Sequence, residues 1–72
     1  MDRQMLAEHI AIAERHVADG RARVKRQRAR LAKLERRGHE TQHAESLLNI
    51  FIDLQTANVA HRDRLREQQY GT

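Results

Sequence analysis

The most constraining feature of this 72-residue chain is an apolar repeat of seven residues, divided in two by a single glycine, Gly38. Side chains with this spacing lie on one stripe of an α-helix. Two such stripes around one glycine predict a helical hairpin whose helices meet along a coiled-coil-like seam. The predicted seam residues are Leu6, Ile10, Ala13, Val17, Val24, Leu31 and Leu34 in the first half, and Ala44, Leu47, Phe51, Leu54 and Leu65 in the second.

Composition indicates an all-α fold without the disulfides or zinc sites that often stabilise a small domain. The chain has no proline, one phenylalanine and one tyrosine, so strand formers and turn formers are rare. It has no cysteine, which excludes a disulfide and a thiolate zinc site and gives no reason to expect an oxidising compartment. Residues 1–4 lack the apolar core of a signal peptide, and the longest apolar run, 50–52, is far too short to cross a bilayer. We therefore expect a cytoplasmic protein with no membrane insertion.

One small domain is expected, because 72 residues bury only a limited core. A helix of the expected length is roughly 50 Å long, so the hairpin must be elongated. The predicted parts are a helix at about 2–37, a turn at 38–40, a helix at about 41–69 and a frayed tail at 70–72.

Residues at the predicted helix ends suit their positions. Asp2 and Thr41 are candidate N-caps, because their side-chain oxygens can accept the opening amide hydrogens. Gly38 can supply the left-handed backbone that ends the first helix. Glu45, in the first turn of the second helix, favours the positive end of the helix dipole.

Antiparallel pairing about Gly38 predicts which residues meet across the seam. Leu31 and Leu34 should meet Leu47 and Leu48, Val24 should lie near Leu54, Gly20 near Asn58, and Ala13 near Leu65. Four residues interrupt the seam: Gly20, Gln27, Asn58 and His61. One interpretation is that they fix its register at some cost in stability. The other is that Gln27, Asn58 and His61 line a small polar pocket in the bundle core.

The second helix is apolar over more of its circumference than one partner helix can cover. We therefore predict a homodimeric four-helix bundle. Alanines beside the seam of the first helix would allow close approach of another helix, or serve simply as good helix formers on a solvated face. The side chains expected at the self-interface are Leu48, Phe51, Ile52 and Val59.

The strongest chemical signal is a basic arm, defined here as residues 21–37. It carries nine cations and one acid, Glu35, and so a formal charge of +8 in a chain of +4, which leaves −4 for the remainder. Arginine outnumbers lysine seven to two, and arginine favours bidentate contacts with phosphate or carboxylate. The cations are Arg21, Arg23, Lys25, Arg26, Arg28, Arg30, Lys33, Arg36 and Arg37.

Three interpretations of the basic arm remain open at the level of sequence. It could bind the backbone of RNA or DNA, with little base specificity because no aromatic residue lies among the cations to stack a base. It could be a solvated face partly paired with Glu40, Glu45 and Asp53 or with acids of a partner chain. It could also meet an acidic protein or an anionic membrane surface, although the apolar face is already used in the bundle.

Residues 39–43 read His-Glu-Thr-Gln-His and match the H-E-x-x-H pattern of helical zinc proteases. The match straddles the predicted turn, so His39 and Glu40 should lie outside the helix and the metal geometry is lost. Ser46, the only serine, has no convincing base and acid partners. We predict no catalytic, metal or cofactor site, and hence no enzyme.

Two short stretches carry a family resemblance. Residues 13–20, Ala-Glu-Arg-His-Val-Ala-Asp-Gly, and residues 61–65, His-Arg-Asp-Arg-Leu, resemble a group of short uncharacterised bacterial proteins that look like helical hairpins of nearly this length. That resemblance implies no assigned activity. The plan also looks like that of the Rop family of hairpin dimers that bind paired RNA loops, a likeness of architecture without a shared motif.

The sequence thus favours a non-enzymatic interaction or regulatory module that self-associates, with another protein as a further partner. The alternative is a dimeric RNA- or DNA-binding protein that uses the basic arm.

Overall fold

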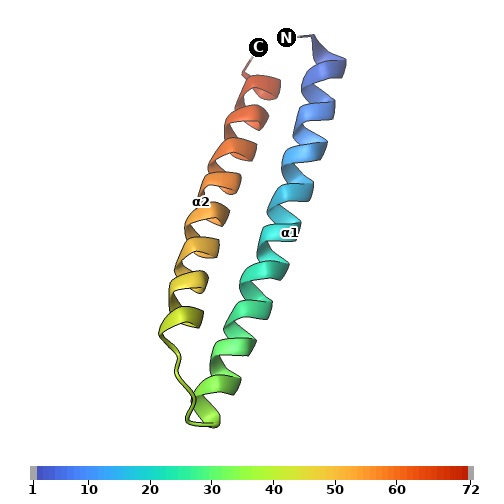
Figure 1. The fold of residues 1–72 in the computed structure, drawn as a ribbon. Coiled ribbons are helices and arrows are strands. Elements are labelled where there is room, and N and C mark those ends of the chain that lie inside the picture. Colours follow the sequence, from blue (N-terminus) through green and yellow to red (C-terminus); the bar gives the residue numbers. More distant parts are fainter. Residues whose placement is uncertain (1, 72) are drawn as a thin grey trace.

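The computed structural model describes residues 2–71 and shows two helices, α1 (Arg3–Arg36) and α2 (Gln42–Tyr70), joined by a short turn. The helices lie side by side and run in opposite directions, so that α1 begins and α2 ends at the same end of the molecule (Figure 1). The principal extents are 54 × 14 × 13 Å, which confirms the elongated all-α hairpin. Both helices lie within one or two residues of their predicted bounds.

The ends of α1 follow the sequence prediction. Asp2 is the N-cap, and its Oδ1 accepts a hydrogen bond from the Met5 amide at 2.8 Å. At the other end Gly38 has a φ of 69°, the left-handed conformation that glycine adopts without a Cβ penalty. The chain reversal is held by the His39 amide, which donates to the Leu34 carbonyl at 3.0 Å.

The start of α2 differs from the prediction. Thr41 occupies the N-cap position but makes no side-chain cap bond, because its backbone is near the helical region (φ −113°, ψ −10°) rather than extended. Its hydroxyl instead donates to Glu45 Oε1 at 3.4 Å. The first amide of α2, that of Gln42, donates to Glu40 Oε1 at 2.6 Å, so a carboxylate of the turn does the capping.

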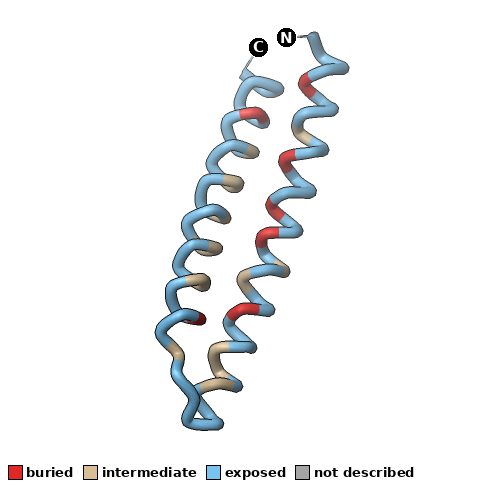
Figure 2. Tube along the Cα trace, in the orientation of Figure 1, coloured by how far each residue is buried: buried red, intermediate tan, exposed pale blue. Residues whose placement is uncertain are grey.

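The apolar core is a thin line between the two helices (Figure 2). Leu6, Ala13 and Leu65 form its main cluster near the open end, with Ile10 packed against them. This confirms the predicted neighbourhood of Ala13 and Leu65. The buried hydrophobic residues are Leu6, Ala13, Val17, Ala44 and Leu65, and the last two are the only ones that α2 contributes.

At two positions of α2, the residue that lies in the seam is the one that follows the predicted residue. Leu54 is 51% exposed and His61 is exposed, so placing them in the seam was wrong. Gln55 and Arg62, the next residues along, are half-buried there instead. Counting from Ala44 in alternating steps of four and three reaches both of them, so the geometry of the repeat overrides local hydrophobicity.

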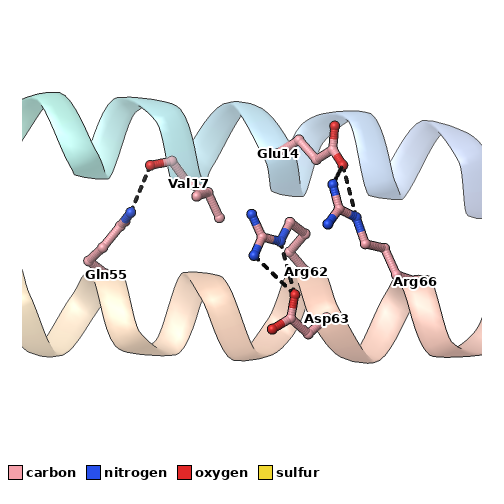
Figure 3. A network of polar contacts seen from close by, with 6 residues as sticks. All are labelled: Glu14, Val17, Gln55, Arg62, Asp63 and Arg66. Atoms are coloured by element: carbon pink, nitrogen blue, oxygen red, sulfur yellow. Dashed lines mark hydrogen bonds and ion pairs between the residues drawn. The ribbon is translucent and has the colours of Figure 1, made fainter.

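A polar side chain can occupy the seam at Gln55 because Gly20 lies opposite. A Cβ at Gly20 would come within 1.9 Å of Gln55 Oε1, so only glycine leaves room for this amide. Gln55 Nε2 donates to the Val17 carbonyl at 2.8 Å, across the two helices (Figure 3). Asn58 Nδ2 donates to Gln55 Oε1 at 3.4 Å and comes within 3.5 Å of the His16 carbonyl, and it lies near Gly20 as predicted.

The other polar seam residues are satisfied separately. Gln27 is only 8% exposed, and its Nε2 donates to the Ala44 carbonyl at 3.0 Å near the turn. Arg62 lies between the helices and pairs with its neighbour Asp63 at 3.1 Å (Figure 3). The suggested polar pocket does not form, because Gln27 and Asn58 bond at different levels of the hairpin and His61 is exposed.

The close approach at Gly20 leads to a prediction about stability. In a Gln55→Ala background, Gly20→Ala should stabilise the fold by about 0.5–1 kcal/mol, the ordinary gain of alanine over glycine in a helix. In the natural background the same change displaces the Gln55 amide, and losing its hydrogen bond costs about 0.5–1.5 kcal/mol, which cancels or reverses the gain. Urea unfolding of the four proteins at one fixed concentration measures the coupling. Equal effects of Gly20→Ala in both backgrounds would contradict it.

Candidate functional site

The basic arm occupies the second half of α1 and its C-cap, Arg37. All nine cations are exposed, and they lie around the helix rather than along one edge. Arg23 is placed most specifically, since its guanidinium carbon lies 5.8 Å from the centre of the Phe51 ring, within range of a cation–π contact. This contact ties the arm to α2 without neutralising its charge.

No acid among residues 2–71 forms an ion pair with a cation of the basic arm. Among residues 2–71 the salt bridges join Arg62 to Asp63 and Arg66 to Glu14, and neither uses a cation of the arm (Figure 3). The pairing with Glu40, Glu45 and Asp53, which the sequence leaves open as one alternative, is therefore not found within the described residues. Glu40 and Glu45 instead accept hydrogen bonds at the start of α2, which orients both carboxylates toward that helix end.

An apolar groove runs along one edge of the hairpin, beside the arm. Its volume is about 570 Å³, and none of its lining residues is acidic. From α1 it is lined by Arg21, Val24, Lys25 and Arg28, and from α2 by Ile52, Gln55, Thr56 and Val59. The three cations recur at steps of four and three residues, so they share one rim of the groove.

The polar side chains that α2 brings to the groove make hydrogen bonds within the hairpin. Gln55 donates to the Val17 carbonyl and accepts from Asn58, while the Thr56 hydroxyl donates to the Ile52 carbonyl of its own helix at 3.1 Å. The charged groups of the groove all belong to its cationic rim. The groove is chemically suited to an apolar surface that carries negative charge.

The residues expected at a self-interface divide between two environments. Leu48 and Phe51 are half-buried positions of the seam, and Ile52 and Val59 line the groove and are also half-buried. Ile50 and Leu54 are more exposed, at 52% and 51%. Neither residue is among the predicted interface residues. Leu54 is predicted to lie in the seam, and the spacing of Leu48 and Ile52 does not show which edge of α2 stays uncovered.

Helical periodicity places Ile50 and Leu54 on the edge opposite the groove, together with Met5 and Ile12 of α1. We call these four residues the exposed edge. Together with Tyr70 they make up the large hydrophobic side chains that are highly exposed among the described residues. Apolar surface is thus left open on both edges of the hairpin, and more fully on this one.

The H-E-x-x-H match does not build a metal centre in the part of the chain that the structure describes. His39 and Glu40 precede α2, while His43 lies in its first turn, so the two histidines are not one helical turn apart on one face. No cluster of three or more potential metal-binding side chains occurs within residues 2–71.

A scan of protein-family models, a search of curated proteins and a search of solved structures each returned no match for the chain. Within the described range, neither helix has a stretch long and apolar enough to span a membrane.

The unpaired state of the arm predicts how stability responds to charge removal. Lys25 lies one turn from Arg21 and from Arg28, so Lys25→Gln removes the repulsion between Lys25 and each of these two cations. The change should stabilise the fold by about 0.5 kcal/mol at low salt. The gain should vanish in about 1 M salt, where charges are screened over a few ångströms. Thermal unfolding followed by circular dichroism measures both. Arg66→Gln, which removes the partner of Glu14, is the matched control and should destabilise instead.

Proposed function

We propose that this protein is a non-enzymatic interaction module that pairs with a second copy of itself, forming a four-helix bundle. The observation that carries the proposal is the exposed edge, where four large apolar side chains stay open to solvent on a protein of this size. Covering Ile50 and Leu54, each about half exposed, contributes on the order of 1 kcal/mol per side chain and per copy.

The thinness of the core supports this function. A hairpin of two helices buries apolar residues on one side of each helix only, and α2 contributes just Ala44 and Leu65 to the buried residues. Cores of this size supply about 3–5 kcal/mol of net stability, so association adds an amount comparable to the stability of the lone hairpin. The folded state and the pairing of copies should therefore be linked.

Self-association predicts a dimer in sedimentation at micromolar concentration. Ile50→Ser with Leu54→Ser should shift the protein to monomer and lower its thermal stability, because the exposed edge loses its apolar contacts. The matched control is Ile52→Ser with Val59→Ser, an equivalent change on the groove edge at two of the residues that the sequence predicts for the interface. This proposal places the contact on the exposed edge instead, so the control should leave the dimer intact. A stable, monodisperse monomer of the natural chain at this concentration would refute the proposal.

A second candidate function is nucleic-acid binding by the basic arm. It is favoured by one observation: nine exposed cations that no acid of the described chain neutralises. Arginine-rich surfaces of this kind bind phosphate backbones with little sequence preference. In a dimer the arm would be presented twice.

This second function predicts retardation of generic duplex RNA or DNA at about 50 mM salt, with affinity falling by about 10³ or more at 200 mM if six or more phosphates are contacted. Arg26→Gln with Arg30→Gln should flatten the salt dependence, since each cation removed lowers the slope by about one. Arg64→Gln, on α2 and away from the arm, is the control. Absence of retardation at the lower salt removes nucleic-acid binding as a function.

A further inference from the structure

We propose that the groove between α1 and α2 binds an amphipathic helix of another protein, one whose apolar stripe is flanked by carboxylates. The groove and its cationic rim are separate from the exposed edge on which self-association rests. The two proposals can therefore fail independently.

The dimensions of the groove suit a helix. Its α1 wall runs from Arg21 to Arg28 and its α2 wall from Ile52 to Val59, a rise of seven residue steps in each case. That span corresponds to two helical turns, or about 10 Å. A third helix laid along it would place residues at steps of three, four and seven against Ile52, Val24 and Val59, the pattern by which amphipathic helices are recognised in grooves.

The charge of the groove selects an acidic partner. Arg21, Lys25 and Arg28 stand on one rim, none of them in an ion pair within the described chain, and no acid lines the groove. Carboxylates at matching steps on a bound helix would each meet a cation at the border of an apolar contact, where water is partly excluded and charge-assisted hydrogen bonds are strong.

A second copy of this chain is a poorer occupant. Two copies seated groove on groove would bring together the three rim cations of each, and the lining contributes no carboxylate to compensate. Like charges brought together in this way oppose association. A nucleic acid would satisfy the cations but leave Val24, Ile52 and Val59 facing a charged backbone.

The test uses the full chain and a labelled designed peptide of four helical turns, with leucines on one face and glutamates beside them. The matched peptide carries lysine in place of each glutamate. Fluorescence anisotropy should show binding of the glutamate peptide only. Ile52→Ser with Val59→Ser should weaken this binding by about tenfold or more, since two apolar contacts are lost, while Ile50→Ser with Leu54→Ser should not.

Charge reversal gives the sharper readout. Arg21→Glu, Lys25→Glu and Arg28→Glu together should abolish binding of the glutamate peptide and create binding of the lysine peptide. The control triple Arg26→Glu, Arg30→Glu and Lys33→Glu makes the same change of net charge outside the groove lining and should keep the original preference. Circular dichroism verifies that each variant is helical.

Three results would overturn the proposal. One is an equal loss of glutamate-peptide binding in the two triples, which would mean general attraction to a basic chain. Another is displacement of the peptide by duplex RNA together with retention of peptide binding in the Ile52 and Val59 variant. The last is loss of self-association in that same variant with no peptide binding by the natural chain, which would assign the groove to the contact between copies.

Discussion

Contact along a single seam between two helices is the constraint on which this structure depends. Each helix of a hairpin has only one neighbour, so only a narrow stripe of each can be withdrawn from water. The seam here meets that limit with small residues at its most buried points, Ala13 and Gly20 among them, which bring the helix backbones close together. Apolar residues outside the buried set of Leu6, Ala13, Val17, Ala44 and Leu65 are at best half-buried among the described residues, and the surface chemistry of the protein follows from this.

The seam is also more polar than a coiled coil of this length would need to be for stability. Gln27 and Gln55 both donate to carbonyl oxygens of the opposite helix, the first near the turn and the second near the middle. Such bonds add little net stability, but losing one partner is costly, because the buried amide that remains has neither a hydrogen-bond partner nor water. A slide of one helix past the other would break both at once, so these two amides specify the register.

The architecture could be predicted from sequence because it rests on regular features: a seven-residue repeat, one glycine and a capping aspartate. The one-residue error in α2 arose where polar residues fill the seam. Leu54 is hydrophobic and Gln55 is not, yet Gln55 lies in the seam, where Gly20 on the other helix leaves room for its amide. The spacing from Ala44 is consistent with Gln55, but the room for its amide comes from a residue 35 positions away in the chain, and hydrophobicity alone does not reveal it. The basic arm was evident from composition, whereas the groove was not, because its walls come from residues on two helices whose rotation had first to be known.

The hairpin turn has a practical consequence for handling the protein. Because α1 begins and α2 ends at the same extremity, Asp2 and Gly71 both lie far from Gly38 and from the arginines near it. A tether at either terminus, whether a fused domain or an immobilising tag, would leave the rod standing with its positively charged tip outward. Any assembly that holds the protein by its termini therefore presents the basic end of the rod to its surroundings.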